Sequence, residues 1–305
     1  MNGFAADRSS GSTDVALALL DALERWLAVD RSPSARELHA ALLAWLRAAQ
    51  AAQPSMALVH QFAARALAVA DAALQRGDSA AALRQALAQS CAAERADFEQ
   101  AVQAAARLAA ELVPGRDAWI ATLSYSGAVL AALRALAKAG RKPRVLLAES
   151  RPGLEGRAMA TALAGEGIES WLVADAALPM LLAQATAVWI GADAVTELGV
   201  LNKIGSFVLA LAAREHGVPM WAIATRRKFL PAATPALAIA EMPPEQIWDS
   251  PPPLVRPRNV LFESVPTSLL RGIVVEDAVL GGTETVIVAR DRTLPDVLAA
   301  APARA

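Results

Sequence analysis

Residues 113–127, VPGRDAWIATLSYSG, decide the fold because the pattern of the chain changes at this stretch. Before it, leucine and alanine recur at helical spacing, and the sequence predicts helices without strands. After it, short apolar runs alternate with amphipathic stretches. Strand, helix and strand at this spacing predict a mainly parallel sheet with right-handed crossovers. We therefore expect an α/β chain, with an all-helical domain at 1–113 followed by a parallel-sheet domain at 114–305.

Caps, glycines and apolar runs set the bounds of the expected elements. In the first domain we expect helices over 15–27, from a cap at Ser32-Pro33, from Gln53-Pro54 to Gly77, and from a cap at Asp78 or Ser79 to about Leu112. In the second we expect strands over 118–123, 144–148, 170–173, 187–190, 220–224 and 272–275, and helices over 127–139, 155–166, 178–185 and 203–216. Residues 243–257 are rich in proline and are expected to form a surface excursion.

Composition excludes several classes of function. Of the 305 residues, 29 are Lys or Arg and 30 are Asp or Glu, so the charge balance does not favour nucleic acid as a partner. The single Cys91 rules out an internal disulfide and a multi-cysteine metal site, and three distant histidines make a histidine metal centre improbable. We expect neither a metal nor a cofactor. The sequence has no signal-peptide pattern and no stretch of about 18 apolar residues, so we expect a cytoplasmic protein without a membrane partner.

The block 191–206, GADAVTELGVLNKIGS, carries the densest group of candidate site residues. Asp193 follows the apolar run 187–190, and Asn202 and Lys203 precede the next apolar helix pattern. Ligands of parallel α/β sheets bind beyond the carboxyl ends of the strands. Lys203 and a helix N-terminus would suit a phosphate, and Asp193 would suit proton transfer. A solvated loop followed by a helix cap explains the same residues, and this block alone leaves both interpretations open.

Two other loops follow expected strands. Residues 122–127, TLSYSG, include Ser126 and Gly127 and suit either an anion cradle or ordinary helix capping. Residues 149–157, ESRPGLEGR, include Arg151, which suits either a bidentate contact with phosphate or a loop-bracing ion pair. The first of these loops lacks the GxGxxG pattern of dinucleotide binding. The chain also lacks the phosphate loop of nucleotide hydrolases and the GxSxG elbow of serine hydrolases.

Taken in order, five motifs resemble one family: TLSYSG, ESRPGLEGR, GAD with NKIGS, KF at 228–229, and VPTSL with VVED. The family contains the alpha, beta and delta subunits of eukaryotic translation initiation factor 2B, methylthioribose-1-phosphate isomerase and ribose-1,5-bisphosphate isomerase. The resemblance covers about residues 118–280. It implies a Rossmann-like second domain that binds a phosphosugar, an N-terminal helical domain, and a homodimer formed through the second domain.

The same resemblance implies roles for single residues. Asp193 matches the aspartate with which the isomerases move a proton, and Asn202 and Lys203 match a pair that contacts substrate. Ser124 stands where the isomerases have a cysteine, and residues 54–62, PSMALVHQF, stand where they have an Arg-Gly-Ala motif that contacts phosphate. A serine hydroxyl is not an acid or base near neutrality without a neighbouring base. The residues that would carry out the reaction therefore match the isomerases less well than the residues that would bind the substrate.

Two functions follow from these residues, and a purely structural assembly role is a third with less support. The first is an aldose–ketose isomerase acting on a ribose-phosphate type of substrate. In it, Asp193 and Ser124 would be catalytic, and Ser126, Gly127, Arg151, Asn202 and Lys203 would bind a small phosphorylated metabolite. The second is a regulatory protein that binds a sugar phosphate or nucleotide without chemistry, as in the initiation-factor branch. The sequence favours the enzyme. Placing a carboxylate beside a lysine in a crevice costs free energy, and such groups are typical of functional sites.

Overall fold

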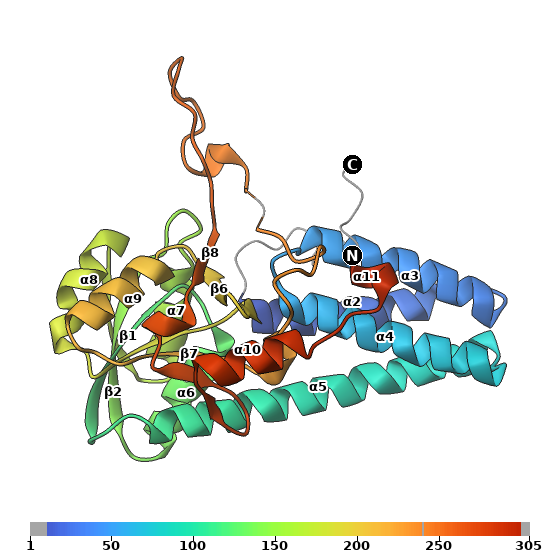
Figure 1. Cartoon of the computed structure of the whole chain (residues 1–305), viewed down its shortest axis with the longest axis horizontal. Coiled ribbons are helices and arrows are strands. Elements are labelled where there is room, and N and C mark those ends of the chain that lie inside the picture. The colour runs from blue at the N-terminus through green and yellow to red at the C-terminus, as the bar shows by residue number, and fades with distance from the viewer. Residues whose placement is uncertain (1–10, 240, 300–305) are drawn as a thin grey trace.

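The N-terminal part of the protein is a bundle of helices, as predicted. The computed structural model describes residues 11–239 and 241–299. Within that part the bundle consists of α2 (Ser12–Val29), α3 (Ala35–Ala52), α4 (Ala57–Arg76) and α5 (Ala80–Glu111). No strand lies between Ser12 and Glu111, which confirms the all-helical prediction. Figure 1 shows α5 running beneath both the bundle and the sheet.

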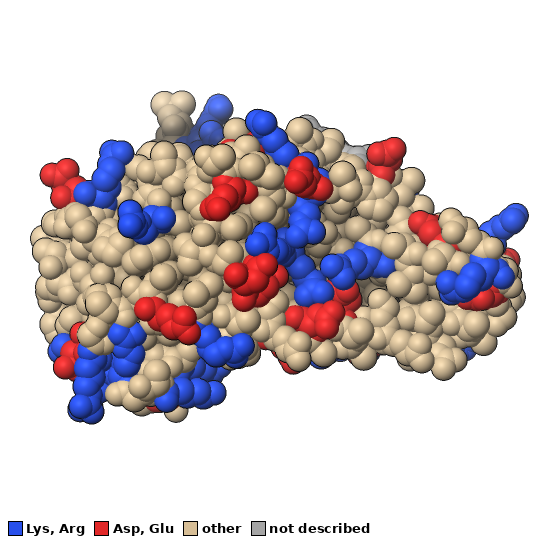
Figure 2. All heavy atoms as spheres, turned by 60° about the horizontal axis from the view of Figure 1, so that its bottom comes forward, with Lys and Arg blue, Asp and Glu red and all other residues tan. Residues whose placement is uncertain are grey.

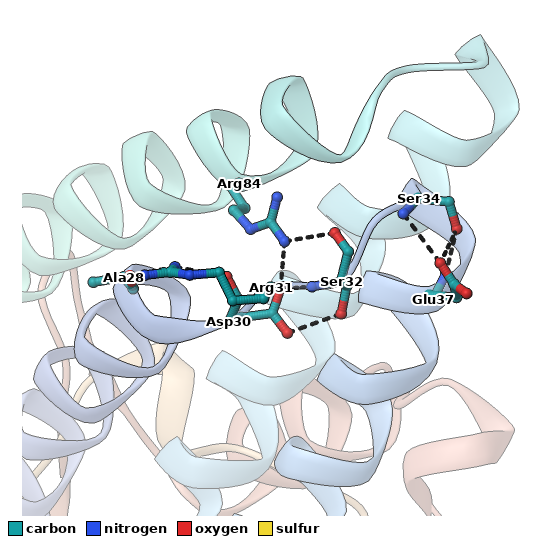
Figure 3. A network of polar contacts seen from close by, with 7 residues as sticks. All are labelled: Ala28, Asp30, Arg31, Ser32, Ser34, Glu37 and Arg84. Atoms are coloured by element: carbon teal, nitrogen blue, oxygen red, sulfur yellow. Dashed lines mark hydrogen bonds and ion pairs between the residues drawn. The ribbon is translucent and has the colours of Figure 1, made fainter.

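Local polar contacts fix the helix ends of this bundle, and two of them differ from the prediction. Ser34, rather than Ser32, caps α3 through a capping box with Glu37 (Figure 3). The Asp30 carboxylate accepts from Ser32 and from Arg84 of α5, which ties the turn to the long helix. The helix expected from Gln53-Pro54 begins only at Ala57, since a turn between Gln53 and Met56 precedes it.

The helix α4 is long and apolar enough to cross a membrane by length and composition alone. In the structure it packs against α2, α3 and α5, and Leu58, Val59 and Leu67 are buried in the core. This is the packing of a central helix in a bundle.

The C-terminal part is built on a seven-stranded sheet in the order β10-β9-β7-β4-β1-β2-β3. The six predicted strands are β1 (Asp117–Leu123), β2 (Lys142–Ala148), β3 (Glu169–Val173), β4 (Ala187–Ile190), β7 (Met220–Ile223) and β9 (Gly272–Val274). They pair in parallel, and only the edge strand β10 (Val279–Leu280) pairs antiparallel. The helices around the sheet are α6 (Gly127–Lys138), α7 (Glu155–Gly165), α8 (Leu178–Leu181), α9 (Ser206–Glu215) and α10 (Gly282–Arg290). The α/β class with a mainly parallel sheet is confirmed.

A second, antiparallel sheet was not predicted. It consists of β5 (Ala194–Thr196), β6 (Gly199–Lys203) and β8 (Phe262–Val265). The helix expected over 203–216 is therefore wrong at its start: Asn202 and Lys203 end β6, and α9 begins at Ser206. The chain turns between them through Gly205 at φ 98°, a left-handed conformation that glycine adopts at low cost.

The bundle and the large sheet share one hydrophobic core. A single cluster joins Leu38 and Leu58 of the bundle to Val129 of α6 and Ile120 and Trp189 of the sheet. On the face shown in Figure 2, basic and acidic side chains are interleaved along the middle of the molecule. The division at residue 113 into two domains stays a prediction.

The proline-rich stretch does leave the body of the protein. In Figure 1 the chain between η4 (Pro244–Gln246) and β8 projects away from both sheets, and Leu254 is fully exposed. At its base, Glu241 and Val260 form an isolated antiparallel bridge. The last described helix, α11 (Asp296–Ala299), returns to the bundle and packs on α4.

Candidate functional site

A cavity of about 360 Å³ lies where the carboxyl edge of the sheet meets the bundle. Its walls come from several stretches of the chain that are distant in sequence. The lining residues are 11–12, 51–56, 123–126, 155, 191–193, 202–203, 241–243, 246 and 261–262. The ends of β1 and β6, the loop after β4 and the end of α3 thus enclose one space.

The structure brings most of the predicted site residues to this cavity. Ser124, Ser126, Asp193, Asn202 and Lys203 all line it. They meet because the neighbouring strands β1 and β4 end at the same edge of the large sheet, and because β6 of the small sheet ends at the same cavity.

Gly127 and Arg151 do not line the cavity. Gly127 is the first residue of α6, and a side chain there would meet Thr13 at 3.1 Å. The Arg151 side chain is exposed, and its backbone N–H donates to Asp175 Oδ2 at 2.8 Å. The expectation that Arg151 contacts phosphate has no support in this geometry, because the loop is held by its backbone and turns the side chain outward.

A chain of hydrogen bonds fixes Ser124. Asp175 Oδ1 accepts from the Ser150 N–H at 2.7 Å, and Ser150 Oγ accepts from the Ser124 N–H at 2.6 Å. Both serines have positive φ, 65° for Ser150 and 61° for Ser124. Non-glycine residues in this region are uncommon and cost about 1–3 kcal/mol each, so the surrounding bonds hold Ser124 in a disfavoured conformation.

Gly191 allows the loop after β1 to approach the strand β6. A Cβ at position 191 would lie 2.5 Å from Ser126 Oγ and 3.8 Å from Asn202 Oδ1. The Asn202 amide donates to Ser206 Oγ at 2.8 Å, and Ser206 Oγ donates to the Lys203 carbonyl at 2.6 Å. These contacts orient Asn202 at the cavity wall.

Asp193 is the most perturbed carboxyl group of the site. It is buried, and burial raises its pKa to about 6 from the ordinary 3.8, although Lys228, Lys203 and a hydrogen bond with Ser12 each act to lower that pKa. Its backbone is pinned on both sides: the N–H donates to Leu201 and the carbonyl accepts from Ala57 at the start of α4. A carboxyl with a pKa near 6 exchanges a proton readily close to neutral pH.

Behind Asp193 lies Lys228, which the sequence did not indicate as a site residue. Its Nζ donates to Ser12 Oγ at 2.8 Å and to the Ala192 carbonyl at 2.6 Å. Burial lowers the pKa of Lys228 to about 8, and the Asp193 charge acts against that fall. A carboxyl with a raised pKa and an amine with a lowered pKa therefore lie on one buried network.

Lys203 is paired within the protein. Its Nζ contacts Glu155 Oε1, and both side chains are about nineteen-twentieths buried. Glu155 begins α7 and also lines the cavity. Among the described residues that line the cavity, Lys203 is the one lysine or arginine.

Sequence reasoning missed Ser12, Glu155, Lys228 and the turn 53–56 as parts of this site. Glu155 and Lys228 stand in motifs that were quoted for the resemblance, ESRPGLEGR and KF, so their position was available but their burial was not. Ser12 carries no local signal at all. Among the described residues, no group of three or more His, Cys, Asp or Glu side chains is placed to hold a metal ion.

Comparison with known proteins identifies relatives with two kinds of name. The chain is 36% identical over 180 residues to a putative translation initiation factor eIF-2B subunit 2-like protein of Pyrococcus furiosus, which covers 58% of this chain and 63% of the relative. It is 34% identical over 184 residues to a methylthioribose-1-phosphate isomerase of Oleidesulfovibrio alaskensis, covering 56% and 51%. The matches thus span between half and two thirds of these relatives.

Solved structures agree over almost the whole chain. The translation initiation factor eIF-2B of Pyrococcus horikoshii OT3 superposes with a TM-score of 0.78 at 26% identity, covering 92% of this chain and 94% of that one. The 5-methylthioribose 1-phosphate isomerase of the same organism shares the fold, with a TM-score of 0.75 at 23% identity over 93% and 84%. The profile of the initiation factor 2 subunit family matches residues 8–281, and this match, together with the fold, shows that the chain belongs to that family.

Proposed function

We propose that the cavity binds a phosphorylated pentose and that the chain catalyses an aldose–ketose isomerisation. The observation that carries the proposal is Asp193, a buried carboxyl whose pKa is raised to about 6 and which lines the cavity together with Ser124. A group that loses and regains a proton near neutral pH suits the transfer of a proton between neighbouring carbons. The similarity to proteins named methylthioribose-1-phosphate isomerase supports the same class of reaction.

In this reaction Asp193 would take the proton from C2 of the sugar and return it to C1. The bond between C1 and the ring oxygen would break, and the proton of the 2-hydroxyl would end on the released ring oxygen, so that C2 becomes the ketone. The Ser124 hydroxyl would donate a hydrogen bond to the oxygen on which charge develops. Lys228 keeps a positive charge behind Asp193, which favours the ionised carboxylate that must accept the proton. The loop 124–126 leads into α6, whose first N–H groups would receive the phosphate.

Conversion of methylthioribose 1-phosphate and of ribose 1,5-bisphosphate tests the proposal, followed by ¹H NMR in deuterium oxide. We expect a ketose product, with solvent deuterium at the carbon that exchanges. Asp193→Asn should abolish conversion while leaving ligand binding within about threefold, because the amide keeps shape but accepts no proton. Conversion at an unchanged rate in Asp193→Asn would refute the assignment of Asp193.

Two observations favour a second function, binding without chemistry. Ser124 offers a hydroxyl where an acid or base is needed, and the turn 53–56 lines the cavity with Pro54 and Met56 rather than with a cation. Ser124→Cys separates the two functions, since a thiol near a helix N-terminus titrates within reach of neutrality. Isomerisation by Ser124→Cys but not by the unsubstituted chain would support the regulatory function.

We also infer that the chain forms a homodimer through its C-terminal part. The exposed apolar side chains Met180 of α8 and Val208 and Leu211 of α9 support this surface. The mass in solution, measured by light scattering, tests it. A monomer at every concentration would contradict the inference.

A further inference from the structure

Residues 247–258 form an arm that contacts little of the chain to which it belongs. The arm projects away from both sheets (Figure 1), and in the described part of the chain the hydrogen bonds of residues 247–257 stay within the stretch 244–257. Trp248 and Val255 are 48% and 44% exposed, and Leu254 is fully exposed. Exposed apolar side chains gathered on one projecting segment are typical of a site that binds another protein surface.

Three consecutive prolines, Pro251–Pro253, stiffen the arm at its tip. Proline-rich segments are extended and semi-rigid, so they have fewer conformations to lose than a flexible loop has. A stiff segment therefore gives up less entropy when it is held against a partner. The composition of the arm thus suits docking.

The same C-terminal part carries a second apolar surface, the α8–α9 face, which consists of Met180, Ile204, Val208 and Leu211. The last three lie at helical spacing, and no charged residue occurs between 204 and 213. The outward side of a surface helix normally carries charged and polar side chains. By contrast, among the described residues 11–111 of the bundle, Val29 is the one large apolar side chain that is exposed.

The charges at the borders of the two surfaces are complementary. The tip of the arm carries no charge over 251–255, and Asp249 and Arg256 flank it. The uncharged stretch of the α8–α9 face ends at Arg214 and Glu215. Within the described residues none of these four side chains forms an ion pair. Each surface therefore offers one acid and one base to the other.

A second copy of the chain presents both surfaces at once. Within one chain the arm lies apart from α8 and α9 (Figure 1), so it does not cover its own α8–α9 face. In a twofold dimer, an arm laid on the partner's face is repeated by symmetry, which doubles the contact. A short arm needs this doubling to approach the about 800 Å² per partner that a stable interface buries.

We propose that the arm of one chain docks on the α8–α9 face of a second copy, so that two copies exchange arms in a twofold dimer. This proposal rests on the inferred homodimer and deepens it, because it names the contact between the copies. The base of the arm also borders the cavity, which Met242, Pro243 and Gln246 line. Docking of the arm therefore holds this rim of the cavity in place.

Light scattering of the full chain over a concentration series is the first test. Leu254→Asp in the arm and Val208→Asp in the face should each raise the dimer dissociation constant by about a hundredfold, since a charge enters the apolar contact twice at about tenfold each. Val29→Asp is the matched control, because Val29 is 68% exposed at the end of α2, and it should leave the constant unchanged. Circular dichroism should be the same for all these chains.

Cross-linking of mixed single variants is the second test, and it reports the contact directly. Leu254→Cys and Val208→Cys chains are mixed in dilute solution, concentrated together and treated with a short bismaleimide linker. The native Cys91 is buried, so the introduced thiols react first. We expect a linked pair that contains one chain of each variant. A mixture of Leu254→Cys with Val29→Cys should give none.

The outcomes separate this proposal from the homodimer itself. A dimer that is unchanged in Leu254→Asp or in Val208→Asp would overturn the exchange of arms and leave a homodimer formed through another contact. Links formed only between two Leu254→Cys chains would also overturn it, because the arms would then lie against each other. An unsubstituted chain that is monomeric at every concentration would overturn the homodimer and the proposal together.

Discussion

Replacing Asp193 with asparagine should change how the stability of the protein depends on pH. In the folded chain burial raises the pKa of Asp193 to about 6, whereas the ordinary value is 3.8. Between about pH 4 and pH 6 the folded state therefore retains a proton that the unfolded state has lost. The free energy of unfolding contributed by this group falls as the pH rises through that window, and asparagine removes the effect.

The magnitude follows from the difference between the two pKa values. A difference of about two pH units, at about 1.4 kcal/mol each, amounts to about 3 kcal/mol. The variant should therefore gain about 3 kcal/mol relative to the unsubstituted chain on going from pH 4 to pH 7. Loss of the Asp193 charge also lowers the pKa of Lys228 further. The buried ammonium of the variant then loses its proton at a lower pH than in the unsubstituted chain. This also makes the variant gain stability, relative to the unsubstituted chain, as the pH rises.

Urea unfolding followed by circular dichroism at pH 4, 5, 6 and 7 measures both chains. Asp117→Asn is the control, since Asp117 is exposed at the start of β1, and its difference from the unsubstituted chain should stay flat from pH 5 to 7. A flat difference for Asp193→Asn over the whole range would refute the claim that this carboxyl is buried and hard to ionise.

Three other predictions follow from packing and from the same carboxyl. If the chain is an isomerase, kcat/KM should rise with pH through about 6, because Asp193 must be ionised to accept a proton; a profile flat from pH 5 to 8 would contradict that role. Gly156→Ala should destabilise the fold by about 1–3 kcal/mol in urea unfolding, because a Cβ there would lie 1.9 Å from the Ala148 carbonyl oxygen. Gly165→Ala, which meets nothing within 4 Å, is its control, and equal stabilities of the two variants would count against the packing described. Phe98→Ala should cost about 3–5 kcal/mol, since that ring is fully buried in α5, and a loss below 1 kcal/mol would be inconsistent with its burial.

Periodicity and strand spacing were enough to predict the large sheet and the bundle. The run 187–190 is apolar throughout, and 118–123 is apolar except for Thr122. Both are bounded by turn residues, so their burial in a parallel sheet could be predicted from the sequence. The small antiparallel sheet was missed because β5 has three residues and β6 five, too few for alternation to be distinguished from a loop. The two residues Glu197 and Leu198, followed by Gly199 and flanked by two valine-containing runs, were the one available signal for that hairpin.

Site residues that directly follow a strand could be located from the sequence. Contacts between side chains from distant elements could not. Ser124 and Asp193 were placed correctly beside the cavity, because the position of a strand end fixes theirs. The pairing of Lys203 with Glu155 was not, since it joins β6 to α7 across the fold and no spacing encodes it. Arg151 points away because two backbone groups of its loop bind Asp175, a contact that depends on the tertiary structure.

The course of α5 has a consequence for how this chain tolerates being cut or interrupted. The helix packs on α2, α3 and α4 along its length and on α6 near its end, where Ala105 and Ala109 are buried. A break after residue 113 would expose an apolar face on each fragment. Neither fragment would then bury its apolar surface by itself. New termini or an inserted domain would instead be accommodated in the projecting stretch 247–258, whose residues cover little of the core.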